Sequence, residues 1–456
     1  MRKLVLLSFL IYAFGYSQNK QVLYDFSNLP QTLLLNPGAE VSHKFHVGLP
    51  LFSQLSVQAG FTGFSAYDIF ADDGIDINNK IRDAVNNYGT TEFMAVNQQL
   101  EIVSAGFRLN ETNYLSFGYY QEFDFLAKIP RDIVDLFYEG NTDINRRYSI
   151  NKLASRAELF GVLHVGLSKR VNSKWQVGGR FKIYSSVFNV NSKLNSGSFF
   201  TEQGSNNSYN QHLDNVNFLM QTSGVFIDNG EDVDASYFKS KLLFGGNLGI
   251  GLDIGFTHQL KKQWIVTGSI LDIGFVNYSK NVESYKVSGD YEVEGFQLNF
   301  DPDNPEDYWN DLKAEFDNSI VSDTLYKSYV LLRPVKLNGS ISYSFGQSYN
   351  DCRFLINPNT YINKIGFHLY STVGAVHSYL AATLFYERRL SKYLQTKITY
   401  TADPYSNSNV GLGIATQLGI FNAYFMADNL LSLNNLYNAK SASFQLGINF
   451  SIQTKN

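Results

Sequence analysis

Long segments of this chain alternate strictly between apolar residues and small or polar residues. From Leu242 to Leu260 one parity carries leucine, isoleucine and phenylalanine, while the other carries mostly glycine together with Asn247 and Asp253. A period of two indicates a β-strand with one apolar face. The run covers 19 residues, whereas strands of soluble proteins average about five or six. A tilted strand needs about 9–11 residues to cross the hydrocarbon of a membrane, so the pattern predicts membrane-spanning strands.

The same alternation recurs along the whole chain and predicts an all-β fold. We expect strands at about 45–64, 93–109, 112–127, 156–170, 173–191, 213–227, 242–260, 263–279, 282–300, 332–346, 364–390 (one or two strands), 393–402, 408–420, 421–429 and 440–452. Short polar junctions join several pairs, whereas residues 191–214 and 350–363 form long polar connections. Short turns that alternate with long loops are typical of outer-membrane barrels. We therefore predict a single transmembrane antiparallel β-barrel of about 14 strands, closed by pairing of the last strand with the first.

Several local departures from the alternation predict irregular elements. The parity slips within residues 264–279, which predicts a β-bulge near Asp272. Residues 69–85 and 130–140 have the pattern of short helices, and a longer helix-bearing insertion is expected at about 301–328. In a barrel such helices are loop insertions that cap or plug the lumen.

The first residues have the composition of an export signal. Arg2 and Lys3 precede an apolar run over residues 4–14, and small residues follow at Gly15 and Ser17. An uncleaved anchor is the alternative, but the run is shorter than the roughly 20 residues of a spanning helix. We predict a signal peptide at 1–17, an N-terminal segment at 18–44 that could plug the lumen, and a barrel at 45–456. The predicted location is the outer membrane of a Gram-negative bacterium.

Composition narrows the class further. Charged residues make up 17% of the chain, against about 25% in typical soluble domains. Cys352 is the single cysteine, which excludes a disulfide scaffold, and the net charge of −4 predicts no nucleic-acid partner. A soluble secreted β-sandwich or propeller is the alternative, but its strands would be shorter and no blade-length repeat is visible.

The chain shows no catalytic signature, so we expect neither enzyme activity nor a cofactor. His43 and His46 are three residues apart, without a third metal ligand nearby in the sequence. Residues 72–78 space oxygen atoms like part of a calcium loop, without the closing glutamate, and residues 301–307 are acidic. Whether these acidic loops bind calcium stays open at this point. The alternative is that they form a solvated turn or the start of a helix.

The inward parity of the predicted strands carries charges of both signs. The residues expected to face the lumen are Arg156, Glu158, His164, Arg170, Arg180, Lys182 and Asp253. Such charges either pair as a filled polar core or line an open pore. We favour paired filling, because glycines at 245, 249, 251 and 255 imply that something packs closely against this wall.

Short motifs on these strands resemble a known family. Residues 29–39, with Leu35, Asn36 and Pro37, resemble the Leu-Asn-Pro-Ala opening of Bacteroidota outer-membrane barrels of the PorP/SprF-like type. Two strand motifs look like that family's Gly-x-Asp-x-Gly and Leu-Asp-Leu-Gly strands, and they contain Gly251, Asp253, Gly255, Asp272 and Gly274. The overall plan also resembles FadL-like barrels. Gly38 and the insertion at 301–328 depart from PorP/SprF, so the chain is most similar to a sister group without an assigned function.

The resemblance implies two functions that the residues do not separate. The first is a non-enzymatic barrel that binds partners or supports structure, linked to cell-surface or type IX secretion proteins. The alternative is a FadL-like channel for small or hydrophobic solutes. A barrel enzyme would need a nucleophile and base that the sequence does not reveal. The expected partners are outer-membrane lipid and surface or periplasmic proteins, and the sequence leaves open whether the lumen is open.

Overall fold

A computed structural model describes residues 20–453 except 27, 194, 205–208, 226–234, 295–321, 348–360, 408 and 432–437. The predicted signal peptide, most of the predicted insertion with its acidic run, and Cys352 lie outside the described residues. The described end of that insertion contains strand β13 (Ser322–Leu325).

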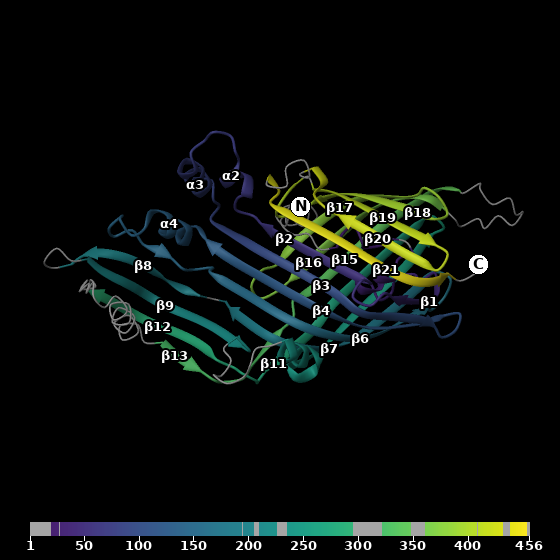
Figure 1. Cartoon of the computed structure of the whole chain (residues 1–456), viewed down its shortest axis with the longest axis horizontal. Coiled ribbons are helices and arrows are strands. Elements are labelled where there is room, and N and C mark those ends of the chain that lie inside the picture. Colours follow the sequence, from purple (N-terminus) through teal and green to yellow (C-terminus); the bar gives the residue numbers. More distant parts are fainter. Residues whose placement is uncertain are drawn as a thin grey trace, which may run out of the picture.

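The chain forms a closed antiparallel barrel of 14 strands, which confirms the predicted fold class (Figure 1). The wall consists of β1 (His43–Gly48), β2 (Gln54–Phe61), β3 (Thr91–Arg108), β4 (Asn113–Pro130), β6 (Ala154–Arg170), β7 (Trp175–Ser192), β10 (Asn247–Lys261), β11 (Trp264–Tyr278), β14 (Tyr329–Leu332), β15 (Val335–Gln347), β16 (Tyr361–Val373), β17 (Tyr379–Arg389), β18 (Leu394–Ala402), β19 (Asn409–Leu418), β20 (Phe421–Ala427) and β21 (Ser441–Gln453). β1 and β2 act as one interrupted strand, since both pair with β3 and β21. β14 and β15 likewise share β11. The β21 pairings close the barrel, as predicted from the unsatisfied edges that an open sheet would have in lipid.

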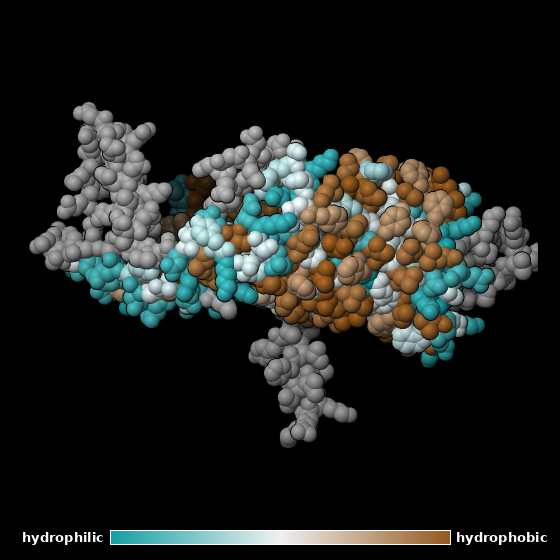
Figure 2. Space-filling model, turned by 90° about the horizontal axis from the view of Figure 1, so that it is seen from below, coloured by the Kyte–Doolittle hydropathy of each residue, from teal (hydrophilic) through white to brown (hydrophobic). Residues whose placement is uncertain are grey.

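The outer surface of the barrel is apolar. On β10 the exposed row comprises Leu248, Ile250, Leu252 and Ile254, whereas the alternate residues Gly249, Gly251 and Asp253 are buried. Figure 2 shows hydrophobic residues gathered over the barrel and hydrophilic residues toward its ends. This is the surface that a lipid-embedded barrel requires. Among the described residues, no helix has the length and apolar character needed to span a membrane.

The predicted bulge lies at Asp272. The register between β10 and β11 shifts between Leu252 and Ile254, and Asp272 adopts a left-handed φ of 60°. The Asp272 backbone N–H leaves the ladder and donates to Asp253 Oδ1 at 2.7 Å. The bulge thereby turns the Asp272 side chain, which is 2% exposed, into the barrel.

The two ends of the barrel differ. At the turn end, short connections such as residues 109–112, 171–174 and 390–393 join the strands. At the loop end lie helices α2 (Ala66–Phe70), α3 (Ile77–Asn86), α4 (Arg131–Glu139) and α5 (Ala235–Ser240) and a π-helical turn η2 (Lys241–Gly245). The strands β5 (Tyr148–Ser149), β8 (Ser196–Gln203), β9 (Tyr209–Ser223), β12 (Ser284–Glu294) and β13 (Ser322–Leu325) extend the sheet beyond the rim at this end (Figure 1).

Three expectations from the sequence are wrong in detail. The strand expected from Leu242 begins at Asn247, because residues 241–245 form the helical turn in which Phe244 has a φ of 71°. The segments expected as wall strands at 213–227 and 282–300 are β9 and β12 of the rim extension, where they pair mainly with each other. The long connection at 350–363 leaves from the turn end, since β15 runs toward the start of β11 there.

Candidate functional site

The inner wall of β7, β10 and β11 carries four charged side chains in contact. Lys182 Nζ lies 2.9 Å from Asp253 Oδ2 and 2.5 Å from Asp272 Oδ1, and Arg180 Nη2 lies 2.5 Å from Asp253 Oδ2. All four side chains are at most 4% exposed. The sequence placed Arg180, Lys182 and Asp253 on the inward parity, and the bulge adds Asp272 to them.

A second group of charges joins the first across the lumen. Arg333, in the break between β14 and β15, lies 2.9 Å from Glu158 and 3.3 Å from Glu122, and Arg156 lies 2.6 Å from Glu158. Lys336 links the groups through Glu122 at 3.3 Å and Asp272 at 2.9 Å. The ion-pair network of the lumen comprises Glu122, Asp124, Arg156, Glu158, Arg180, Lys182, Asp253, Asp272, Arg333 and Lys336.

This network crosses the barrel rather than following its wall. Glu122 and Glu158 come from β4 and β6, whereas Arg333 lies just before β15 and Lys336 at its start, with β7, β10 and β11 between them in the sheet. Buried charges are tolerated when they are paired and hydrogen-bonded. Here the acids of one wall neutralise the cations of the other, and only small cavities remain beside the network.

The N-terminal segment, residues 20–42, lies inside the barrel. Strands on different sides of the wall bind its backbone: Arg180 of β7 donates to the carbonyl oxygens of Leu33 at 2.9 Å and Leu34 at 2.6 Å, Lys364 of β16 donates to Asp25 O at 2.6 Å, and Lys397 of β18 donates to Tyr24 O. The segment includes a short 3-10 helix, η1 (Pro30–Leu34), that begins at a proline. Its position obstructs the middle of the lumen.

The Leu-Asn-Pro motif anchors this segment to the glycine-rich wall. Asn36 donates through Nδ2 to Phe256 O at 3.1 Å and accepts at Oδ1 from the Gly38 N–H at 2.9 Å. A Cβ at Gly255 would lie 2.1 Å from Asn36 Oδ1 and 3.0 Å from Pro37 Cδ. The motif therefore packs where Gly255 has no side chain, and the two family-like motifs are parts of one contact.

The other motif glycines serve the wall itself. A Cβ at Gly251 would meet the Tyr184 hydroxyl at 2.4 Å, and a Cβ at Gly274 would meet Ile250 O at 2.4 Å. Leu35 contributes a backbone acceptor, because the Ser269 hydroxyl donates to Leu35 O at 2.6 Å. Close packing of this kind requires glycine or a small residue.

The opposite side of the N-terminal segment is held by apolar contacts. Val22, Leu23, Phe26 and Leu29 form a buried cluster with Ala415, Tyr424 and Met426 of β19 and β20. A Cβ at Gly413 would lie 2.7 Å from Val22 Cγ1 and 3.0 Å from Phe26 Cε2. One face of the segment is thus fixed by polar bonds and the other by hydrophobic packing.

Lys20 is the first described residue and lies deep in the lumen. Its ammonium group donates to Gln99 Oε1, and Glu101 and Glu122 are on the neighbouring strands β3 and β4. Desolvation by burial lowers the pKa of Lys20 to about 8, from an ordinary value of 10.5. Removing an ammonium group from water disfavours its charged form, and the acids nearby compensate for this only in part.

The remaining sequence candidates lie apart from one another. His164 is buried beside the Tyr120 ring, with centroids 5.7 Å apart. His43 Nε2 bonds to Asn28 O and His46 Nδ1 to the Tyr114 hydroxyl, so the two histidines have separate partners. Arg170 is half-exposed at the turn end, where it pairs with Glu40 at 3.4 Å.

The acidic loop at 72–78 forms local structure. Asp76 caps α3 by accepting from the Asn78 N–H at 2.9 Å, and Asp73 pairs with Lys80 at 2.6 Å. Within the described ranges, no group of three or more metal-ligating side chains comes together.

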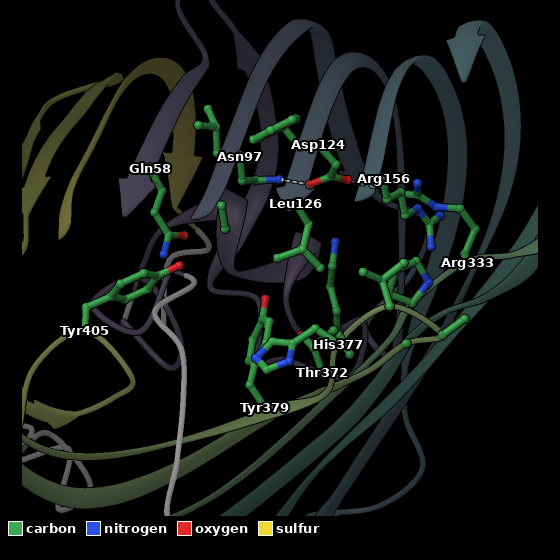
Figure 3. A pocket seen from close by; sticks show the side chains of 18 residues that line it. Gln58, Asn97, Asp124, Leu126, Arg156, Arg333, Thr372, His377, Tyr379 and Tyr405 are labelled. Atoms are coloured by element: carbon green, nitrogen blue, oxygen red, sulfur yellow. Dashed lines mark hydrogen bonds and ion pairs between the residues drawn. The ribbon is translucent and has the colours of Figure 1, made fainter. Parts of the chain in front are cut away.

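Cavities remain on both sides of the N-terminal segment. At the loop end, a cavity of about 90 Å³ lies between Arg156, Arg333 and Asp124 on one side and Tyr379 and Tyr405 on the other (Figure 3). At the turn end, two cavities of about 710 and 740 Å³ share lining residues and together form the turn-end vestibule. The lumen is therefore wide at one end and almost filled at the other.

Four members of the network were missed by the sequence analysis. Glu122, Asp124, Arg333 and Lys336 belong to it but were neither expected lumen residues nor part of a family-like motif. Arg333 follows two leucines and precedes Pro334. A charged residue at a proline-interrupted strand is a usable signal, because proline breaks the ladder and lets the neighbouring side chain turn inward.

The comparisons with known proteins place the chain in a family without identifying its role. A family model described as a family of unknown function, DUF5723, matches residues 37–428. No curated protein matches the chain.

Several solved barrels are similar to this one. A FadL homologue of Pseudomonas aeruginosa has 9% identity and a TM-score of 0.43, with 96% of this chain and 97% of that chain covered. The toluene transporter TodX of Pseudomonas putida has 10% identity and a TM-score of 0.38, with 97% and 96% covered. An outer-membrane channel of Pseudomonas putida F1 has 9% identity and a TM-score of 0.29, with 89% and 97% covered.

Proposed function

We propose that this chain, which belongs to the DUF5723 family of unknown function, is an outer-membrane channel closed by its own N-terminal segment. The closed barrel with its apolar outer surface supports residence in a membrane. The export signal predicted at residues 1–17 supports delivery to the outer membrane of a Gram-negative cell. The solutes are small, because the spaces that they would cross are cavities inside a single barrel.

The observation that carries the proposal is the position of residues 20–42. They separate a vestibule with cavities of about 710 and 740 Å³ from the loop-end cavity. Hydrogen bonds from Arg180 and Lys364, together with the apolar cluster around Val22, hold the segment in place. These contacts are non-covalent, so the segment can leave the lumen without disturbing the barrel ladder.

The partner-binding function stays a prediction from the family resemblance. A link to cell-surface or type IX secretion proteins would place the important contacts outside the barrel, whereas the features described above lie inside it. The solute channel, which was the alternative from the sequence, is therefore the function that we carry forward.

Conductance in planar lipid bilayers tests the proposal. We expect the full chain to be closed or to open rarely, and a variant without residues 20–34 to conduct steadily, because the deletion removes the obstruction and retains Asn36 and all wall strands. Heat-dependent gel mobility shows whether the variant forms a barrel. A folded deletion variant that never conducts would overturn the channel.

A disulfide lock identifies the moving part. In a Cys352→Ser background, Val22→Cys and Gly413→Cys place two thiols in contact, since a Cβ at Gly413 lies 2.7 Å from Val22 Cγ1. Oxidation should abolish the residual openings of the full chain, and reduction should restore them. The two single-cysteine variants are the matched controls, and equal conductance in oxidised and reduced double variants would contradict movement of this segment.

A further inference from the structure

The turn-end vestibule has an excess of basic side chains. Its two cavities are lined by three arginines and four lysines but only four acidic residues. Arg170 and Arg389 line both cavities. The ion-pair network deeper in the lumen contains as many acids as bases, so it does not share the charge excess of the vestibule.

The cations of the vestibule differ in their ion pairing. Lys364 pairs with Glu387 at 2.8 Å, and Arg170 pairs with Glu40 at 3.4 Å. Within the described part of the chain, no carboxylate lies at ion-pair distance from Arg389 or Lys174. A concave site lined by one sign of charge focuses the field and concentrates counter-ions.

The vestibule already holds one carboxylate, which belongs to the N-terminal segment. Glu40 pairs with Arg170, and the neighbouring Val41 carbonyl accepts from the guanidinium group of Arg108. Two arginines of the vestibule therefore hold the segment where it leaves the lumen. Guanidinium groups bind carboxylate and phosphate in the same geometry, so a solute with such groups competes for the same donors.

We infer that the turn-end vestibule binds small solutes that carry carboxylate or phosphate groups, with Glu40 as the internal competitor for Arg170. The inference rests on the proposed function, because it names the class of solute that the channel would take. The cavities lie inside the barrel mouth and are lined partly by the N-terminal segment, which favours a small molecule over a folded partner.

Calorimetric titration of the full chain in detergent at low ionic strength tests the inference, with inorganic pyrophosphate as the probe. The double variant Arg389→Gln/Lys174→Gln should weaken binding about three- to tenfold, because two unpaired cations are lost. The matched control is Lys152→Gln, an exposed lysine at the loop end, which should bind like the parent. No detectable binding, or equal binding by the double variant and the control, would overturn the inference.

A change of opposite sign tests the role assigned to Glu40. Glu40→Gln removes the competing carboxylate, so pyrophosphate should bind about twofold tighter, in keeping with the small energy of an exposed pair. Weaker binding by Glu40→Gln would contradict the competition. All titrations keep the N-terminal segment in place and need no conduction. A chain that binds but never conducts would overturn the channel alone, and a chain that conducts but does not bind would overturn this inference alone.

Discussion

Toward the loop end the lumen narrows to a cavity of about 90 Å³, whereas toward the turn end it widens into cavities of about 710 and 740 Å³. Both halves are rich in charge, but the pairing differs. In the loop-end half, Arg333 and Lys336 meet Glu122, Glu158 and Asp272 across the barrel. In the turn-end half, basic residues outnumber acidic ones, and the space between them stays open.

The difference shows that charged side chains can fill part of a lumen when they are paired with opposite charges. Opposite charges on facing walls can approach to hydrogen-bond distance and exclude water, since each partner replaces the solvation that the other loses. Cations without a carboxylate partner cannot do this, so they keep their water. The four predictions below test whether the two halves respond as differently as this account requires.

The largest effect is expected for Glu158→Gln in the closed half. Glu158 is fully buried and accepts from Arg156, Arg333 and Asn189, so loss of its charge leaves two guanidinium groups undercompensated. Breaking a buried pair costs about 3–5 kcal/mol. Denaturant unfolding of the refolded barrel measures the loss. Glu111→Gln, an exposed acid of the vestibule, is the matched control and should change stability by less than about 0.5 kcal/mol.

The next effect concerns the contact that anchors the N-terminal segment. Gly255→Ala places a Cβ 2.1 Å from Asn36 Oδ1, so the motif must move or the wall must deform. Overpacking of this kind costs about 1–3 kcal/mol, and openings in bilayers should become more frequent. Gly339→Ala is the control, because nothing lies within 4 Å of its added Cβ. If both variants unfold and conduct alike, the anchor does not restrain the segment.

A pH effect is expected from Lys20, between the two halves. Its native pKa of about 8 lies below the ordinary 10.5, so the unfolded chain binds more protons between these values. Stability conferred by this group therefore rises from about pH 8 to pH 10.5 and is lowest below pH 8. Lys20→Met should remove the rise, and the difference in unfolding free energy between parent and variant should change over this range. A constant difference would mean that Lys20 is solvated.

The smallest effect is expected in the open half. Arg389→Gln and Lys174→Gln remove cations that have no ion-pair partner among the described residues, so each should change the free energy of unfolding by less than about 1 kcal/mol. The same unfolding measurement used for Glu158→Gln applies. Losses as large as those for Glu158→Gln would mean that the vestibule charges contribute to the fold, which would erase the contrast between the two ends.

Much of the barrel wall was predictable because the alternation of apolar and polar residues within a strand shows which of its faces meets lipid. The row Leu248, Ile250 and Leu252 must face lipid wherever the strand lies, and the slip at Asp272 requires a bulge in any antiparallel pairing. The errors arose where a neighbour decides the outcome. β9 and β12 alternate like wall strands, but they pair beyond the rim. The end of the barrel at which β15 finishes, before the connection at 350–363, depends on the number of wall strands that precede it.

The sequence by itself determined the class of protein, the closed sheet, the outward rows and the inward parity of Arg180, Lys182 and Asp253, because a period of two needs only local geometry. Tertiary structure alone decided that Arg333 reaches Glu158 across the lumen and that Asn36 packs against Gly255. Those pairs are separated by 175 and about 220 positions in the chain. Their contact depends on the curvature that closes the barrel, and no local pattern records that curvature.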